Sequence, residues 1–186
     1  WLKRMAASSL SPGVGAYNAV VDSCAKAGDP EAAVRWLTEM MNQRVEPDTV
    51  SYNAVINSYA RASDTLGTSR WLEKMGKARR QPNIISYNTV VGAYARVGDP
   101  DGVAGVLDSM TEAGLEPNVV TWTSMITACA NARPKRMEAA ERVFRRMLER
   151  GVAPNKVTLR SLGRAVGSQR RRELLQELGD GAGRWR

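Results

Sequence analysis

The stretch Tyr17-Asn18-Ala19-Val20 decides the fold, because it returns at a constant spacing along the chain. It recurs as Tyr52-Asn53-Ala54-Val55 and Tyr87-Asn88-Thr89-Val90, and more loosely as Trp122-Thr123-Ser124-Met125, each 35 residues after the one before. A second marker, a proline followed by Asp or Asn, runs in phase with the first. Its copies are Pro47-Asp48, Pro82-Asn83, Pro117-Asn118 and Pro154-Asn155. Two phased markers at a fixed period predict a repeat protein.

The two markers divide the chain into repeats, the last of which is two residues longer than the others. We place the two extra residues at 132–136. Residues 1–13 match the end of a repeat, so we expect them to form the second helix of a truncated one. Residues 156–186 begin a further repeat, lose the pattern and end in a C-terminal tail. We interpret the chain as a fragment of a longer protein. The full repeats are 14–48, 49–83, 84–118 and 119–155.

Each repeat is predicted to contain two helices. Apolar residues from Tyr17 to Ala25 recur every three or four positions, which gives a first helix one apolar face. Asp29-Pro30 and Asp99-Pro100 supply an N-cap and a first-turn proline for a second helix. Short hydroxyls are predicted to cap the first helices, and they are Ser51, Ser86, Thr121 and Thr158. The predicted fold is all-α, a right-handed superhelical solenoid of helix-turn-helix repeats.

Composition narrows the possible chemistry. The chain has 27 basic and 19 acidic residues, and a basic surplus favours nucleic acid or acidic surfaces as partners. The repeats alternate between net acidic and net basic, however, so the chain is not a uniformly basic strip. It has no histidine and only two cysteines, which removes the commonest general base and any cysteine-rich zinc site. We therefore expect no enzyme, no catalytic residue, no metal and no cofactor, and no stretch is apolar enough to cross a membrane.

A helix pair of 35 residues, with Tyr-Asn near its start and Pro-Asp or Pro-Asn at its end, resembles the pentatricopeptide repeat. The rival is the tetratricopeptide repeat, which has a period of 34 and a Trp-x-x-Leu-Gly-x-x-Tyr signature. That signature is absent here. The resemblance covers residues 1 to about 162 and implies that each repeat reads one base of single-stranded RNA.

The resemblance also assigns roles to particular positions. In each repeat one base-reading side chain follows the aromatic residue, and a second follows the closing proline. The implied pairs are Asn18 with Asp48, Asn53 with Asn83, Asn88 with Asn118, and Thr123 with Asn155. An aliphatic residue three places before the first of each pair wedges between bases. These base-wedging residues are Val50, Ile85 and Val120, while Gly15 in the first repeat is a poor wedge.

Similar pairs in the family imply an RNA preference of U, then C or U, then C or U, then A, read 5′ to 3′. They also imply a role in RNA processing, stability, editing or translation in a plastid or mitochondrion. Asn at a helix start and Asp or Asn after proline are also common cap and turn residues, so a purely structural role stays open for each. The alternative function is a helical-repeat scaffold for protein–protein interaction.

Three basic residues recur eight positions after the first base-reading residue. They are Lys26, Arg61 and Arg96. Eight residues correspond to about 12 Å along a helix, so these side chains are candidates for phosphate contacts, as the resemblance also implies. The alternative is a cation that stabilises the C-terminal end of its helix through the dipole. The fourth repeat has Asn131 at this position.

Overall fold

The computed structural model describes residues 11–179. The prediction for residues 1–13 therefore falls mostly outside the described residues, as does the end of the tail. Every regular secondary-structure element assigned within residues 11–179 is an α-helix, which confirms the predicted all-α class. The chain forms two compact units, Trp1–Ala93 and Tyr94–Arg186, called here the first unit and the second unit.

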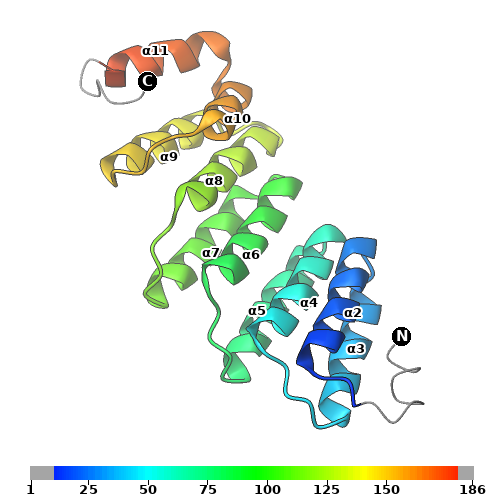
Figure 1. Cartoon of the computed structure of the whole chain (residues 1–186). Coiled ribbons are helices and arrows are strands. Elements are labelled where there is room, and N and C mark those ends of the chain that lie inside the picture. The colour runs from blue at the N-terminus through cyan, green and yellow to red at the C-terminus, as the bar shows by residue number, and fades with distance from the viewer. Residues whose placement is uncertain (1–10, 180–186) are drawn as a thin grey trace. The chain divides into compact units, whose positions relative to one another are not determined.

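The first unit contains two complete helix pairs, shown in Figure 1. Their helices are α2 (Val14–Ala27), α3 (Pro30–Asn42), α4 (Thr49–Arg61) and α5 (Thr65–Lys77). Within each pair the two helices pack together, and α2 also packs against α4 of the next pair. The fully buried side chains between them include Val21, Leu37, Val55, Ile56 and Met75. Each helix is only 13 or 14 residues long, a length that is marginal alone in water, so stacking stabilises the repeats.

The turn between α2 and α3 follows from three residues in sequence. Gly28 ends α2 with φ 71°, in the left-handed region where glycine has no steric penalty. Asp29 then caps α3, because its Oδ1 accepts a hydrogen bond of 2.8 Å from the Ala32 backbone N–H. Pro30 occupies the first turn of α3, where its missing N–H removes no helical hydrogen bond.

The prediction that short hydroxyl side chains are the N-caps of the first helices is wrong, because the N-cap lies three residues earlier. Asp48, not Ser51, is the N-cap of α4, and its Oδ1 accepts a hydrogen bond of 2.9 Å from the Ser51 backbone N–H. Ser51 lies three residues into the helix, where its Oγ accepts the Asp48 backbone N–H in return, which completes a capping box. The same arrangement occurs in the second unit with Asn118 and Asn155 as caps. Both residue types cap helices well, and the sequence alone did not rank them.

Helix α6 (Ile84–Val97) runs from the first unit into the second. The second unit continues with α7 (Pro100–Glu112), α8 (Val119–Asn131), α9 (Met137–Glu149), α10 (Lys156–Val166) and α11 (Ser168–Gly179). Its core joins α8, α9, α10 and α11 through buried side chains such as Ile126, Phe144, Met147, Leu162 and Leu174. The 132–136 linker between α8 and α9 is longer than the two residues that join α6 to α7.

The residues that lose the repeat pattern still form a helix pair, α10 and α11. Leu174 of α11 is fully buried in the core of the second unit. Arg170 of α11 donates two hydrogen bonds of 2.9 Å to the carboxylate of Glu141 on α9, and it also bonds Glu173 and Glu177. These contacts give α11 the character of a capping helix at the end of the stack. Among residues 11–179, no helix combines the length and apolar character that a membrane crossing requires.

Candidate functional site

The two residues predicted to read the first base, Asn18 on α2 and Asp48 before α4, are in direct contact. The Asn18 Nδ2 group donates a hydrogen bond of 3.1 Å to Asp48 Oδ1. A carboxylate accepts hydrogen bonds and donates none, so this contact fixes the amide with its nitrogen toward Asp48. Asn18 Oδ1 then accepts a hydrogen bond of 2.5 Å from the Ser51 hydroxyl. The pair is thus held in one geometry by two consecutive repeats.

Asp48 is held as a carboxylate by its neighbours. Burial raises the pKa of the Asp48 carboxyl, but hydrogen bonds from the Ser51 backbone and hydroxyl and from the Asn18 amide outweigh burial. The backbone N–H of Val50 acts in the same direction, and the pKa lies below its ordinary value. At neutral pH the first pair therefore presents an acceptor at Asp48 and an amide at Asn18.

The second pair, Asn53 and Asn83, is connected by the hydroxyl of Ser86 on α6. Asn53 Oδ1 accepts a hydrogen bond of 2.6 Å from Ser86 Oγ, which lies 3.2 Å from Asn83 Oδ1. Asn83 Oδ1 also accepts the Ile85 and Ser86 backbone N–H groups, so Asn83 serves as a cap like Asp48. The Nδ2 groups of Asn53 and Asn83 form no hydrogen bond within residues 11–179, and both side chains are half-buried.

The fourth pair, in the second unit, is linked by a chain of hydroxyls. Thr123 Oγ1 lies 2.7 Å from Thr158 Oγ1, which donates a hydrogen bond of 3.1 Å to Asn155 Oδ1. Thr123 is only 8% exposed, so this predicted base-reading side chain is the least accessible of the set. For the third pair, Asn88 is half-buried on α6, and half-buried Asn118 is the N-cap of α8.

The predicted base-wedging residues share one position, the second residue of a first helix. Val50, Ile85 and Val120 are 59%, 61% and 51% exposed, which is unusual for large aliphatic side chains. Val157 occupies the same position in α10 and is 48% exposed, a residue that sequence reasoning missed. Its spacing from Val120, 37 residues, follows the longer fourth repeat and would have revealed it.

In the first unit the basic residues lie at helix ends. Lys26 Nζ forms an ion pair of 2.7 Å with Asp22 on its own helix. Arg61 Nη2 donates a hydrogen bond of 3.1 Å to the Lys26 backbone carbonyl near the C-terminal end of α2. This contact favours the helix-end role for Arg61. The guanidinium has five N–H donors and is exposed, so further donors remain for a phosphate.

In the second unit Asn131 makes the helix-end contact in place of a cation. Asn131 Nδ2 donates a hydrogen bond of 2.8 Å to the Ala95 carbonyl, and the Arg164 guanidinium donates to Asn131 Oδ1. Arg164, on α10, thereby places a positive charge beside Asn131, the position at which the series Lys26, Arg61 and Arg96 has no basic residue. The sequence hid this residue, because Arg164 lies four positions before the one that continues the repeat spacing.

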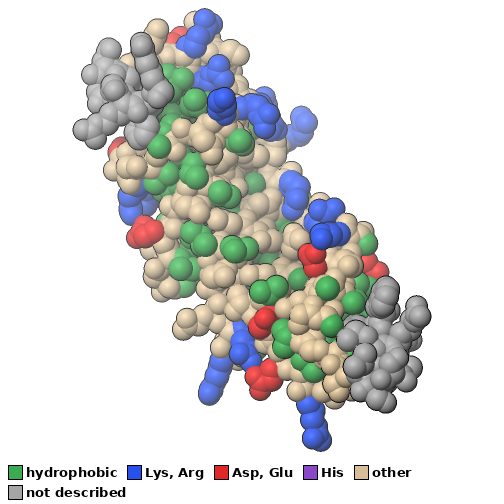
Figure 2. Space-filling view, in the orientation of Figure 1, with side chains coloured by type: hydrophobic (Ala, Val, Ile, Leu, Met, Phe, Trp, Pro, Cys, Tyr) green, Lys and Arg blue, Asp and Glu red, His purple; other side chains and the backbone are tan. Residues whose placement is uncertain are grey.

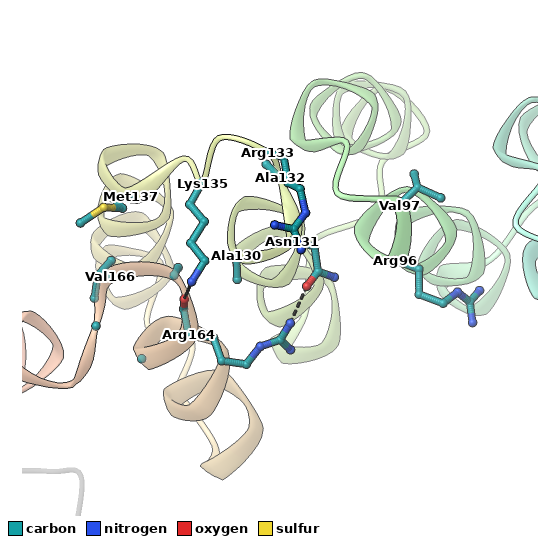
Figure 3. Close-up of a pocket in the computed structure, with 13 residues that line it drawn as sticks. Arg96, Val97, Ala130, Asn131, Ala132, Arg133, Lys135, Met137, Arg164 and Val166 are labelled. Atoms are coloured by element: carbon teal, nitrogen blue, oxygen red, sulfur yellow. Dashed lines mark hydrogen bonds between the residues drawn. The ribbon is translucent and has the colours of Figure 1, made fainter.

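Arg164 also lines an open basic pocket of about 880 Å³ in the second unit. Its charged lining residues are Arg96, Arg133, Lys135 and Arg164, and no acidic residue of the described chain is among them. Figure 3 shows Lys135 directed to the Arg164 backbone carbonyl, a hydrogen bond of 2.9 Å, and Arg164 directed to Asn131. Two of the four cations come from the 132–136 linker. Such a pocket attracts anions.

On the face shown in Figure 2, Lys and Arg side chains lie in clusters, with exposed hydrophobic side chains between them. Within each unit, exposed aliphatic wedges, polar pairs and cations provide both apolar and hydrogen-bonding groups. We call the base-reading pairs, the base-wedging residues and the basic residues together the first-helix site.

Tandem helix pairs with recurring polar side chains at the starts of the first helices define a helical-repeat protein. The model of the PPR repeat family matches residues 12–61 and 82–131, and the PPR repeat model matches residues 50–79 and 120–152. The chain belongs to the pentatricopeptide repeat family. None of the curated proteins matches the sequence.

Solved structures show the same fold. The pentatricopeptide repeat protein PPR10, in complex with an 18-nt psaJ RNA element, matches 98% of the chain with a TM-score of 0.81 at 21% identity. PPR10 from maize matches 96% with a TM-score of 0.79 at 22% identity. The chain spans about a quarter of PPR10, 27% and 26% of its length in the two structures. The PPR domain of Arabidopsis thaliana protein-only RNase P 1, in complex with tRNA, matches 89% of this chain over 86% of its own, with a TM-score of 0.70 at 16% identity.

Proposed function

We propose that the chain is a single-stranded RNA-binding module that reads one base per repeat, with a preference for U, C or U, C or U, and A from 5′ to 3′. The observation that carries the proposal is the geometry of the base-reading pairs. In three repeats the two predicted side chains of a pair meet at one hydroxyl of the following helix, Ser51, Ser86 or Thr158. Membership of the family and the RNA bound to PPR10 add support.

The chemistry of each pair fits the base it is proposed to read. The ionised Asp48 carboxylate only accepts hydrogen bonds, and uracil presents an N–H donor on its Watson–Crick edge. Asn18, oriented by Asp48, adds an amide beside it. The pair Asn53 and Asn83 offers neutral amides with Nδ2 donors, which suit the acceptor groups of a pyrimidine edge. Because these residues are already positioned by protein hydrogen bonds, little side-chain freedom is lost on binding.

The wedges and cations provide affinity without sequence preference. Val50, Ile85 and Val120 present exposed apolar surface to any base, and stacking on larger aromatic platforms contributes about 1–3 kcal/mol per base. Aliphatic wedges contribute less, so a four-base module should bind with a Kd between about millimolar and micromolar. The pocket cations Arg133 and Lys135 lie with Arg96 and Arg164, where a backbone phosphate would be attracted.

Fluorescence anisotropy at micromolar protein tests the proposal. One labelled RNA carries U-C-C-A in an otherwise purine context, and a second carries A-G-G-C in its place. We expect tighter binding of the first RNA, with the preference lost in the double variant Asn53→Ala with Asn88→Ala. Asn42→Ala, at the exposed end of α3, is the matched control and should bind like the parent protein. Equal binding of both RNAs by the parent protein would refute coded reading.

A reciprocal exchange of closing residues separates base reading from helix capping. Asn83→Asp gives the second repeat the Asn–Asp pair of the first, and Asp48→Asn gives the first repeat the Asn–Asn pair of the second. Since Asp and Asn cap helices equally well, both variants should keep the fold. We expect the preference at the second base to move from C to U in Asn83→Asp, and preference for U at the first base to weaken in Asp48→Asn. Unchanged preferences would leave these residues with only a capping role.

The salt dependence of binding tests the phosphate contacts. Phosphate contacts at Lys26, Arg61 and Arg96 predict a slope of log K against log salt of roughly −2 for a single strand, and further contacts in the basic pocket would make the slope steeper. Replacing Arg133, Lys135 and Arg164 with Gln should make this slope shallower while the preference for U-C-C-A remains. A slope that does not change would exclude the basic pocket from the RNA path.

A further inference from the structure

A second groove lies in the second unit, between the second helices of two consecutive repeats. Its walls are α7 and α9, and its floor is formed by Trp122, Met125 and Cys129 of α8. The three helices are labelled in Figure 1. The groove has a volume of about 860 Å³, and we call it the outer groove. Nothing in the proposed reading of RNA uses it.

Small side chains line the outer groove at two positions that hold aromatic rings in the second repeat, 49–83. In the first unit Trp71, the seventh residue of α5, packs with ring centroids 6.3 Å from Tyr52 and 6.5 Å from Tyr59 of α4. The equivalent of Trp71 in α9 is Val143, and the equivalent of Tyr59 in α8 is Cys129. In the first unit a pocket of about 360 Å³ lies at the end that corresponds to Glu116, Pro117 and Trp122, and its lining includes Glu46, Pro47 and Tyr52.

The floor of the outer groove contains an unsatisfied hydrogen-bond donor. Trp122 is only 6% exposed, and its indole Nε1 has no hydrogen-bond partner among residues 11–179. Buried tryptophan N–H groups usually find an acceptor, because an unpaired buried donor loses its bond to water without replacement. Trp122 lines the outer groove, but its Nε1 atom is covered, so a ligand acceptor there would satisfy the donor only after the indole turns toward the groove.

The two walls of the outer groove carry opposite charges. At its ends Arg136 pairs with Asp101 at 3.4 Å, and Arg150 pairs with Glu116 at 3.6 Å. Between these two ion pairs the α7 wall presents Asp108 and Glu112, and the α9 wall presents Arg142 and Arg146. Within residues 11–179, Asp108, Glu112 and Arg146 form no ion pair, and Arg142 reaches only Glu138 of its own helix at 4.0 Å.

We propose that the outer groove binds a short extended peptide segment of a partner protein. A bulky apolar side chain of the segment packs on Trp122 and Met125, and a backbone carbonyl accepts the hydrogen bond of the Trp122 indole. A basic side chain faces Asp108 and Glu112, and an acidic side chain faces Arg146. The 13 residues of α7 extend over about 20 Å, which an extended segment of about six residues matches.

The acceptor and the charges select this occupant over two others. A helical segment has its backbone carbonyls bonded within the helix, whereas an extended segment offers a free carbonyl to Trp122. RNA is disfavoured because the phosphates of a bound strand would run along the carboxylates of α7. A dipolar peptide, by contrast, complements both walls at once.

Selection from a display library of random heptapeptides on the immobilised protein tests the proposal. The library is first depleted on the variant Val143→Trp, which restores the plug found at Trp71. We expect the enriched peptides to share one large apolar residue flanked by a basic and an acidic residue. An enriched synthetic peptide should bind Val143→Trp at least about tenfold more weakly. No enrichment, or equal binding to the plugged variant, would overturn the proposal.

A charge exchange provides a second test that does not depend on the core. Arg146 is exposed, so Arg146→Glu should fold normally. We expect it to weaken the selected peptide and to bind better a peptide whose acidic residue is replaced by Lys. U-C-C-A RNA should bind both variants as it binds the parent protein, because neither residue belongs to the first-helix site. If Arg146→Glu instead weakens RNA while peptides are unaffected, the outer groove is a nucleic-acid surface and the peptide proposal fails.

Discussion

The first and second units are built from the same kind of repeat, but they differ in how the second helix of a repeat packs on the first helix. In the first unit Trp71 fills the space over α4 and stacks on Tyr59, with Lys74 Nζ 4.2 Å from the centre of the Trp71 ring. In the second unit Val143 leaves the equivalent space over α8 open. The capping boxes at the starts of α4 and α8 are alike in both units. The repeat therefore keeps its first-helix ends constant while the outer packing varies.

A separate variation occurs within each unit, at pairs of positions that change together. Where the first helix carries a tyrosine, the second helix has glycine, as in Tyr59 with Gly67 and Tyr94 with Gly102. Where the first helix carries a cysteine at this position, the second helix has alanine at the position of the glycine. These pairs are Cys24 with Ala32 and Cys129 with Ala139. A Cβ at Gly67 would lie 2.2 Å from Tyr59 Cδ1, so the large ring requires the missing side chain.

The largest expected effect comes from removing the aromatic plug. Trp71→Ala leaves a cavity beside Tyr52 and Tyr59 and should lower the free energy of unfolding by about 3–5 kcal/mol. Val143→Ala in the second unit removes only two carbons and should cost about 1.5 kcal/mol. Urea unfolding followed by circular dichroism measures both, with the data fitted to a nearest-neighbour model of repeats. Equal losses would show that the two units are packed alike after all.

Exchanging one repeat's packing pair for another's should have the next largest effect. Gly67→Ala forces its new methyl group against Tyr59 and should destabilise by about 1–3 kcal/mol. Adding Tyr59→Cys recreates the Cys–Ala pair found elsewhere and should recover part of the loss, a coupling that a double-mutant cycle measures. Gly76→Ala on the same helix meets no atom within 4 Å and is the control, expected to be neutral or slightly stabilising. Additive losses would contradict the pairing.

Acid should distinguish the cap of α4 from the amide caps. The pKa of Asp48 is lower in the folded chain than in the unfolded one, so its contribution to stability is full above the unfolded pKa and is lost as pH falls through the folded pKa. Asp48→Asn should therefore flatten the decline of stability below about pH 4, and Asp48→Ala should cost about 1 kcal/mol at neutral pH. Thermal unfolding between pH 7 and pH 2 measures this. If Asp48→Asn loses stability toward low pH as steeply as the parent protein does, the role of ionised Asp48 as a stabilising cap is contradicted.

The sequence was sufficient for the features that each repeat determines locally. Asp29-Pro30 and Gly28 fix a helix start and a helix end by their own backbone preferences, and the 35-residue period predicts where the helix pairs begin and end. The positions of Val50 and Ile85, which are exposed in the structure, were assigned by the resemblance to the pentatricopeptide repeat and not by the period alone. These features need no knowledge of how repeats stack.

Features that depend on the neighbouring repeat could not be predicted. The bond from Ser51 to Asn18 joins residues 33 positions apart and exists only once α4 packs on α2. The outer groove arises from side chains that are smaller than their equivalents, and a missing volume has no sequence pattern of its own. Arg164 joins the site through the hydrogen bond of its guanidinium to Asn131, although its position in the sequence does not follow the repeat spacing.

The smallest expected effect concerns the first repeat, whose wedge position holds a glycine. Gly15 occupies this position in α2, and a Cβ built there meets no atom within 4 Å, so Gly15→Val should fit without strain. If the exposed aliphatic residues contact bases, the Gly15→Val variant should bind U-C-C-A RNA more tightly by roughly 0.5–1 kcal/mol, a few-fold in Kd. An RNA with an abasic site at the first position should gain nothing, because no base remains to be wedged. Gly105→Val, exposed on α7, is the matched control and should leave RNA affinity unchanged. A gain that is the same with the abasic RNA would mean that the valine acts only by stiffening the first turn of α2.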